Sequence, residues 1–410
     1  MNPFVNKNIF YIKIFYKKFL EIFKFITIIY LFIGKTYSEQ YNVEIKPPKI
    51  NAESYILIDY YSGQVLAEMN ADSKRLPASL TKMMTSYIIG MYIKSGHIKS
   101  SDLVKISKES WMLGNPSLKG SSSMFLKPGD LVSISDLSRG IILQSGNDAC
   151  VAIANYISGN QESFVELMNN YAKKLKLKNT HFKNVHGLDN AGQFTSARDM
   201  SIIGTYLIKD VHEEYIKYKE KEFTYNNIRQ LNRNNLLWDK TLNVDGIKTG
   251  HTKLAGYNLV ASAINENMRL ISVILGGRSI NERDNGSKSL LNWGLRSFNT
   301  ILFLRSNEKF VKKYIFFGKT NYAYLGVKND IYITVPRGKE KEIKIEYIFF
   351  DSTLKAPLKK YQQVGKIFFK LNNSIIQQHP LLVLENVDSG NIFNKILDYM
   401  KLAINHFVNN

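Results

Sequence analysis

The stretch Pro77-Ala78-Ser79-Leu80-Thr81-Lys82 places a serine and a lysine three residues apart at the beginning of a long apolar segment. Apolar residues continue at helical spacing as far as Ile93, and Pro77 suits the entry of a helix. Side chains at positions i and i+3 share one face of a helix. We therefore expect a helix over residues 79–93, buried on a broad face, with Ser79 and Lys82 side by side at its N-terminal end.

This pair of residues suits nucleophilic catalysis. A serine hydroxyl is a weak nucleophile unless a neighbouring base takes its proton. A lysine can take that proton only when it is neutral, which requires burial or a second cation nearby. Backbone N–H groups at a helix N-terminus also offer part of an oxyanion hole. Because S-x-x-K is short and occurs often by chance, this interpretation needs support from other motifs.

Two further motifs follow in the chain. Ser145-Gly146-Asn147 begins 66 residues after Ser79, between two predicted helical segments, and Lys248-Thr249-Gly250 begins 101 residues after Asn147, just before two predicted strands. On an edge strand, the third motif offers a cation, a hydroxyl and a bare backbone that a substrate can approach. The ordered set S-x-x-K, S-D-N and K-T-G marks penicillin-binding proteins and class A β-lactamases.

With these motifs the sequence resembles the low-molecular-mass penicillin-binding proteins, the serine D-alanyl-D-alanine carboxypeptidases of the penicillin-binding protein 5/6 group. The resemblance runs from about residue 52 to the tail, and it is carried by residues 77–85, 144–150, 185–189, 231–234 and 244–252. The second motif reads Ser-Gly-Asn, as in the carboxypeptidase branch, which argues against a class A β-lactamase. Glu166 resembles the deacylating glutamate of those enzymes but is predicted to be a surface charge on a helix.

The resemblance implies a role for each matching residue. Ser79 would attack the carbonyl of the penultimate D-Ala of a peptidoglycan stem peptide, and Lys82 would accept its proton. Ser145 would relay a proton to the departing D-Ala, and Asn147 would orient the lysines and a substrate amide. The backbone N–H groups of Ser79 and His251 would hold the oxyanion. The substrate-binding residues implied are Lys248, Thr249, Gly250, His251 and Arg233. A β-lactam would acylate Ser79 in the same way.

The order of predicted elements indicates an α+β fold. We expect a β-lactamase/penicillin-binding-protein-like domain, with helices on both faces of an antiparallel sheet and a helical subdomain, followed by a small all-β sandwich and a C-terminal amphipathic helix. The predicted boundaries are a signal peptide at 1–38, a linker at 39–51, the peptidase domain at 52–298, the β domain at 299–388 and the tail helix at 389–410. An uncleaved N-terminal anchor is the alternative to the signal peptide.

The predicted tail helix has one apolar and one polar face. Packing against the β domain is one interpretation of that apolar face, and an in-plane membrane anchor is the other. Because the chain is predicted to be exported, we expect the enzyme at the periplasmic face of the inner membrane, attached peripherally through this helix.

The chain has 410 residues and a formal net charge of +20, which suggests a nucleic-acid partner at first. However, the first 38 residues carry six lysines and one glutamate, and residues 299–388 carry 15 basic and 8 acidic residues. The charge is therefore spread thinly, without the block of like charges that marks a polybasic arm. A biased coding composition explains this pattern, and we expect no nucleic-acid partner.

We also expect no metal and no cofactor. The single cysteine, Cys150, excludes an intramolecular disulfide and a zinc site built from several cysteines. It is predicted to be a small buried residue rather than a nucleophile. His181 and His186 are five residues apart, which suits no common helical metal pair. Trp238 is predicted to lie in the core.

Two classes of alternative function remain at this stage. One is another acyl-serine chemistry on the same fold, either a β-lactamase or a transpeptidase. The other is a catalytically idle protein that binds the cell wall through its β domain and tail. The intact set of Ser79, Lys82, Ser145, Asn147 and Lys248 argues against the idle protein.

Overall fold

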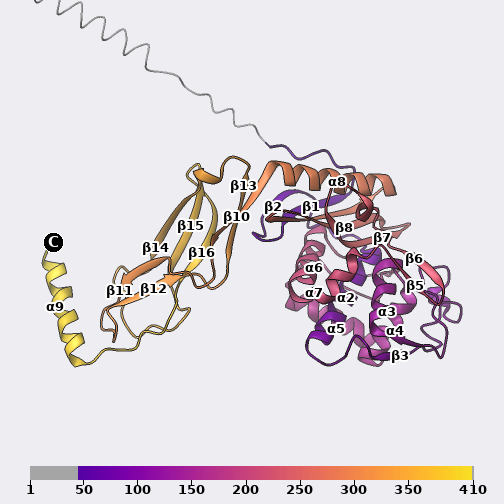
Figure 1. Ribbon diagram of the computed structural model, residues 1–410, viewed down its shortest axis with the longest axis horizontal. Helices are drawn as coiled ribbons and strands as arrows, with labels where there is room; N and C mark the ends of the chain where they lie inside the picture. Colours follow the sequence, from indigo (N-terminus) through magenta and orange to yellow (C-terminus); the bar gives the residue numbers. More distant parts are fainter. Residues whose placement is uncertain (1–44, 409–410) are drawn as a thin grey trace, which may run out of the picture. The chain divides into compact units, whose positions relative to one another are not determined.

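A computed structural model describes residues 45–408, with side chains as far as residue 404. Residues 47–408 of this range belong to one unit of the chain. The predicted signal peptide and residues 39–44 of the predicted linker lie outside the described residues. Figure 1 shows the elements coloured along the chain.

The central sheet has five antiparallel strands in the order β2-β1-β9-β8-β7. The strands are β1 (Ser54–Asp59), β2 (Val65–Met69), β7 (Val244–Thr252), β8 (Gly256–Asn265) and β9 (Met268–Gly277). Every residue of β1 is buried. This explains its continuous apolar sequence, since a strand covered on both faces shows no alternation. The K-T-G motif lies on β7, at one edge of the sheet, as predicted.

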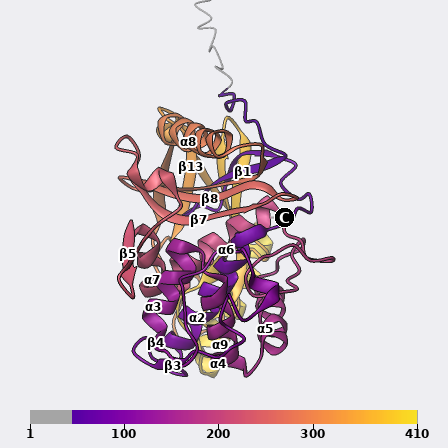
Figure 2. The ribbon, with the colours of Figure 1, turned by 90° about the vertical axis from the view of Figure 1, so that its right-hand side faces the viewer.

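Helices cover both faces of this sheet (Figure 2). Helix α8 (Ile280–Ser297) packs on β8 and β9 from one side, and α6 (Ala197–Asp210) packs on β1 and β9 from the other. Gly204 of α6 permits close packing, because a Cβ there would lie 3.2 Å from the Cδ1 of Ile247. The predicted α+β class is therefore confirmed.

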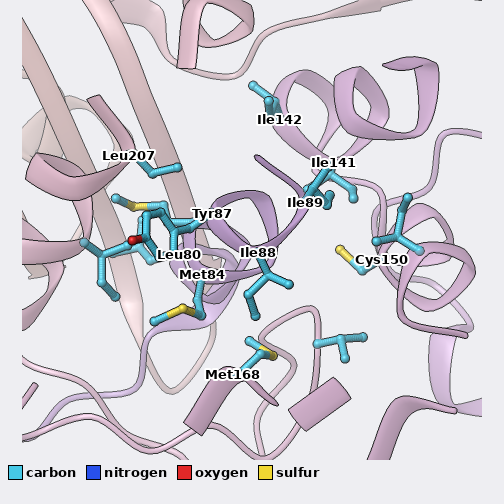
Figure 3. Packing of buried hydrophobic residues seen from close by; sticks show 14 of the residues in the cluster. Leu80, Met84, Tyr87, Ile88, Ile89, Ile141, Ile142, Cys150, Met168 and Leu207 are labelled. Carbon is cyan, nitrogen blue, oxygen red and sulfur yellow. The ribbon is translucent and has the colours of Figure 1, made fainter. Parts of the chain in front are cut away.

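The helical subdomain surrounds α2 (Lys82–Lys94). Its neighbours are α3 (Ile134–Arg139), the π-helical turn η3 (Gly140–Gln144), α4 (Asn147–Ser158), α5 (Gln161–Lys174), α7 (His212–Tyr215) and η4 (Ile216–Lys219). Figure 3 shows Met84, Tyr87, Ile88 and Ile89 of α2 among side chains from the surrounding helices. Because α2 is buried almost all round, its sequence is apolar on more than one face.

The first motif differs locally from the predicted helix. Ser79 lies in a 3-10 turn, η1 (Ala78–Thr81), and the α-helix itself begins at Lys82. Ala78 has a φ of +49° in this turn. Such a conformation is strained for a residue with a side chain and is typical of functional sites.

The β domain contains a five-stranded antiparallel sheet in the order β11-β12-β16-β15-β14 and a two-stranded ladder, β10-β13. The strands are β10 (Phe298–Leu304), β11 (Val311–Tyr314), β12 (Tyr322–Gly326), β13 (Ile331–Pro336), β14 (Lys344–Phe349), β15 (Gln363–Leu371) and β16 (Ser374–Val383), with a short turn η6 (Glu340–Glu342). A separate apolar core joins the two layers around Leu325, Ile333, Ile367 and Phe369. The tail forms α9 (Ile392–Val408), as its periodicity predicts.

The sequence did not predict several short elements. These are β3 (Leu103–Lys105), β4 (Leu131–Ser133), β5 (Glu222–Tyr225), β6 (Ile228–Leu231), η2 (Pro116–Leu118) and η5 (Asn235–Trp238), together with α7, η4, η6, β10 and β12. The long helix α6 was not predicted either. The prediction for Trp238 was wrong. Its side chain is 42% exposed at the end of η5, where Lys221 lies over the ring, so it is a surface residue and not part of the core.

Candidate active site

The first and third motifs meet where β7 passes η1. Gly250 makes this approach possible, because a Cβ at that position would lie 3.1 Å from the backbone nitrogen of Ser79 and 3.1 Å from the carbonyl oxygen of Pro77. Asn258 of β8 also holds the turn before the serine, donating from Nδ2 to the carbonyl oxygens of Leu76 and Pro77. The glycine of K-T-G therefore allows a strand backbone to lie directly against the serine.

The second motif joins them through Lys82. The Nζ of this lysine donates to Ser79 Oγ at 3.0 Å, to Asn147 Oδ1 at 2.6 Å and to the carbonyl oxygen of His186 at 2.7 Å. These three acceptors use all the donors of an ammonium group. Lys82 is completely buried, so its position is determined by these bonds rather than by solvent.

Burial changes the charge of this lysine. Removal from water lowers the pKa of Lys82 from its ordinary 10.5 to about 8, and the nearby Arg233 cation lowers it further, against the opposing effects of Cys150 and Asp148. A lysine of this kind is neutral in a useful fraction of molecules near neutral pH. It therefore meets the requirement for a base that acts on a serine hydroxyl.

Lys248 is a second buried lysine. Its Nζ donates to the carbonyl oxygen of Thr249 at 3.0 Å. Burial, with the neighbouring cations of Lys82 and Arg233, holds the pKa of Lys248 well below its ordinary value. The Arg233 guanidinium beside these two lysines supplies positive charge at the site, which suits an anionic substrate.

Ser145 lies between two helical segments in a left-handed conformation with φ of +63°. Its Oγ is buried and has no hydrogen-bond partner among the described residues. Such a strained, unpartnered hydroxyl is typical of a functional position, because a structural serine would be expected to have a partner.

Arg233 reaches the site from the segment after β6. Its Nη1 donates to Ser122 Oγ at 2.9 Å. Asn234, the next residue, is buried and donates from Nδ2 to the carbonyl oxygen of Gly246 on β7. The segment is thus attached to the same edge strand that carries K-T-G.

A cleft of about 880 Å³ opens over these groups. Seven of the nine sequence-predicted site residues line it: Ser79, Ser145, Asn147, Arg233, Thr249, Gly250 and His251. The other two, Lys82 and Lys248, are buried residues that do not line the cleft. His251 is exposed at its edge, where its ring stacks on that of Tyr257 with 4.1 Å between centroids.

Sequence reasoning missed several residues of this cleft. Ser122 contacts both Arg233 and Asn147, and the carbonyl of His186 accepts from Lys82. Asp189 accepts from the hydroxyl of Thr252, which ties the end of β7 to the segment after His186. Ser122 lies in a serine-rich segment that gave no sequence signal. His186 and Asp189 belong to residues 185–189, which carry part of the resemblance, but the motifs predicted no role for them.

Two side chains that might have suggested other chemistry do not reach the cleft. Cys150 is buried, and burial raises the pKa of its thiol to about 12, so it is not an activated nucleophile. Glu166 lies on the exposed face of α5, as predicted. Neither residue lines the cleft.

Comparison with known proteins places the chain in a family. Residues 41–279 match the D-alanyl-D-alanine carboxypeptidase family, and residues 298–389 match the C-terminal domain of penicillin-binding protein 5. The chain is 56% identical over 379 residues to D-alanyl-D-alanine carboxypeptidase DacA of Escherichia coli K12, covering 92% of this chain and 94% of that protein.

Solved structures of related proteins support the same family. Penicillin-binding protein 5 of Haemophilus influenzae superposes with a TM-score of 0.82 at 48% identity, covering 84% of this chain and 99% of that one. The DD-transpeptidase of Streptomyces K15 superposes with a TM-score of 0.57 at 26% identity, covering 61% of this chain and 99% of that one. The resemblance found in the motifs is confirmed. The chain therefore belongs to the D-alanyl-D-alanine carboxypeptidase family, a family of serine hydrolases that act on peptidoglycan stem peptides and bind β-lactams.

Proposed function

We propose that this enzyme removes the terminal D-Ala from peptidoglycan pentapeptide stems through an acyl-enzyme on Ser79. Ser79 Oγ attacks the carbonyl carbon of the penultimate D-Ala, and its proton passes to the neutral Nζ of Lys82. The carbonyl oxygen becomes an oxyanion that accepts from the backbone N–H groups of Ser79 and His251. The approach of β7 to η1 at Gly250 supports this arrangement, because it brings the two backbones to opposite sides of one small space.

Collapse of the intermediate breaks the peptide bond. The proton that Lys82 took from Ser79 passes through Ser145 to the departing D-Ala amine, which leaves Lys82 neutral again. Ser145, whose Oγ has no hydrogen-bond partner among the described residues, lines the cleft with Asn147. Water then attacks the ester, Lys82 again accepts a proton, and the shortened peptide leaves with Ser79 restored. Asn147 holds Lys82 through its Oδ1 and keeps its amide group for the substrate.

The free carboxylate of the terminal D-Ala needs cationic and hydrogen-bonding partners. Arg233 and Thr249, which line the cleft, would supply them beyond the scissile bond. Lys248 lies buried next to Thr249 in the same strand. A guanidinium suits this role because its planar donors match a carboxylate. Partners of this kind favour an exopeptidase, because an endopeptidase substrate has no free carboxylate next to the scissile bond.

The observation that carries this proposal is the bond from Lys82 Nζ to Ser79 Oγ on a lysine whose pKa is lowered by burial. The test is mass spectrometry of enzyme treated with penicillin, together with release of D-Ala from a pentapeptide. We expect one adduct, on Ser79, and no adduct or D-Ala release in Ser79→Ala. An adduct on another residue, or undiminished D-Ala release by the variant, would contradict the assignment.

Transpeptidation deserves a direct comparison because one structural neighbour is a DD-transpeptidase. An acyl-enzyme of either kind can pass its acyl group to water or to an amine. Incubating the enzyme with pentapeptide and a glycine-type amine acceptor separates the two, since hydrolysis yields tetrapeptide and transpeptidation yields the amide. We expect tetrapeptide as the main product. A β-lactamase would instead release hydrolysed penicillin rapidly, without accumulating the Ser79 adduct.

The tail helix supports a second part of the proposal, attachment to a membrane surface. Asp398 on the inner side of α9 is buried and accepts from Tyr314 Oη and from the backbone N–H of Phe317, each at 2.6 Å. The large apolar side chains of the helix remain exposed: Ile392, Phe393, Ile396, Leu397, Met400 and Ile404. A helix that docks by a polar residue and exposes apolar ones suits the plane of a bilayer interface.

Across residues 45–408, no helix combines the length and apolar content that a membrane span requires. We place the enzyme at the periplasmic face of the inner membrane, exported by residues 1–38 and held by α9. Truncation after residue 389 should release the protein from membranes, and Ile396→Asp should do the same without removing the helix. Asn373→Asp, which adds the same charge at an exposed turn between β15 and β16, is the control. Retention of the truncated protein would point to the N-terminal segment as the anchor.

The domain boundaries form a third part of the proposal. We propose a peptidase domain at 52–298, a β domain at 299–388 and an anchoring helix at 389–410, joined to the export segment by a linker at 39–51. The separate apolar cores support the first two. Limited proteolysis of the mature enzyme, with penicillin labelling of the fragments, tests whether the peptidase domain folds alone.

A further inference from the structure

Asp148, the residue after the second motif, is a buried carboxylate that the reaction scheme does not use. It lies in the first turn of α4 and is 1% exposed. Its oxygens accept from Ser123 Oγ at 2.6 Å and from the backbone N–H groups of Met124, Leu126 and Ala149 at 2.9–3.2 Å. Most of these donors belong to one short segment, residues 123–126, so the carboxylate is the point to which that segment is attached.

This segment forms part of the substrate cleft. Ser121 and Ser122, just before it, line the cleft. The carbonyl of Ser122 accepts from the backbone N–H of Asn147 at 2.8 Å, and its Oγ accepts from Arg233 at 2.9 Å. Phe125 has a φ of +68°, a conformation that a non-glycine residue keeps only when its surroundings impose it. The bonds to Asp148 supply that constraint.

Asp148 also explains why the second motif contains a glycine. A Cβ at Gly146 would lie 2.7 Å from Asp148 Oδ1 and 3.1 Å from the backbone nitrogen of Met124. A side chain at position 146 would therefore displace the carboxylate or the segment that it holds. The Ser-Gly-Asn form of the motif and the buried Asp148 belong to the same local structure.

We propose that Asp148 is a positioning residue for recognition of the substrate carboxylate. By holding residues 123–126, it keeps Ser122 against Arg233 and so directs the guanidinium toward the terminal D-Ala. This inference rests on the proposed role of Arg233. Asp148 touches neither substrate nor the reacting atoms, and its effect appears in selectivity for a free C-terminal carboxylate.

The test compares two substrates: a diacylated peptide ending in D-Ala-D-Ala, and the same peptide with a C-terminal amide. The measured quantity is the ratio of their kcat/KM values in the full enzyme. Asp148→Asn keeps the shape but turns an NH2 toward backbone donors, which displaces the segment. We expect the ratio to fall about tenfold, mainly through a higher KM for the free carboxylate, since small misplacements of a binding group have effects of this order or larger.

Three further variants make the test specific. Arg233→Gln should lower the ratio at least as much as Asp148→Asn, and the double variant should fall no further than Arg233→Gln alone, because both changes remove one interaction. Ser123→Ala, which removes one donor only, should give a smaller fall and remains informative if Asp148→Asn does not fold. Met168→Ala, a buried change on α5, is the control for lost stability and should leave the ratio unchanged.

Far-UV circular dichroism and a cooperative unfolding transition in urea confirm that each variant is folded before the ratio is measured. Penicillin labelling cannot serve here, because it depends on the same carboxylate-binding groups. An unchanged ratio in folded Asp148→Asn and Ser123→Ala, alongside a lowered ratio in Arg233→Gln, would overturn the positioning role of Asp148. An unchanged ratio in Arg233→Gln would instead overturn the proposed role of Arg233 itself. A fully additive double variant would show that Asp148 acts by a route other than Arg233.

Discussion

The pH dependence of acylation offers the sharpest test of Lys82 as the proton acceptor. Only neutral Lys82 can take the proton of Ser79. A lysine with a pKa of about 8 is neutral in about one molecule in ten at pH 7, whereas one at the ordinary 10.5 is neutral in about three in ten thousand. The burial seen in the structure therefore raises the reactive fraction about 300-fold at pH 7.

The assay is the second-order rate constant for labelling by a fluorescent penicillin, measured from about pH 5.5 to about pH 9.5. We expect the rate constant to rise about tenfold for each pH unit well below 8 and to level off above it, because the neutral fraction of Lys82 follows this course. The penicillin carboxylate stays ionised throughout this range, so the midpoint reports on the enzyme.

Two charge variants should move the midpoint in opposite directions. Asp148 raises the pKa of Lys82, so Asp148→Asn removes a negative charge and should shift the midpoint to lower pH. Arg233 lowers the pKa of Lys82, so Arg233→Gln removes a positive charge and should shift the midpoint to higher pH. Met168→Ala changes no charge and should leave the midpoint in place.

Three results would refute this reasoning. A rate constant that stays level below pH 8 would mean that the titration of Lys82 does not control acylation. A midpoint near the ordinary lysine value would mean that burial does not lower its pKa. Shifts of the same sign in the two charge variants would mean that the effect is not electrostatic.

Three other changes test the supporting structure. Gly187→Ala should reduce penicillin labelling strongly, because Gly187 has a φ of +95° and a Cβ there would lie 1.9 Å from the carbonyl oxygen of Ala78. Gly192→Ala is the control for backbone strain, since Gly192 has a φ of +82° and only one lysine side chain near its Cβ position. Glu214→Ala should lower the free energy of unfolding, measured in urea, by about 3–5 kcal/mol, because the substitution leaves the buried Lys217 unpaired. The exposed neighbour is the control: Glu213→Ala should change the free energy of unfolding by less than about 0.5 kcal/mol. Asn147→Ala should slow acylation about 100-fold in stopped-flow labelling, since the base loses a 2.6 Å acceptor; a change below threefold would contradict its orienting role.

Glu214 shows how the subdomain holds its helices together. Its carboxylate accepts from Ser86 of α2, from Ser138 of α3 and from Lys217 of η4. One buried residue thus joins the helix that carries Lys82 to the helix before Ser145. Nothing in the residues around it singles out Glu214, since a lone glutamate before an aromatic segment is ordinarily a surface residue.

The sequence alone predicted the chemistry because the chemistry depends on residue types at short spacings. Ser79 and Lys82 are neighbours by local geometry, and the order of the three motifs identified the fold class and the family. Periodicity predicted α4, α5 and α9, as well as the paired strands β8 and β9, because their apolar positions repeat over several turns or along whole strands. Short elements such as β3 and β5 have too few residues for any period to appear.

Only the tertiary structure decided how distant residues meet. Lys82 acquires its lowered pKa from complete burial, which results from packing of α2 among its neighbours and cannot be seen in the residues beside it. Ser122 reaches Arg233 because Asp148 holds the segment after Ser122, and Asn234 ties the segment of Arg233 to the edge strand β7. Residue types and local spacing therefore predicted which groups react. Long-range packing, which removes water and constrains backbone conformation, decided their charge states and their positions.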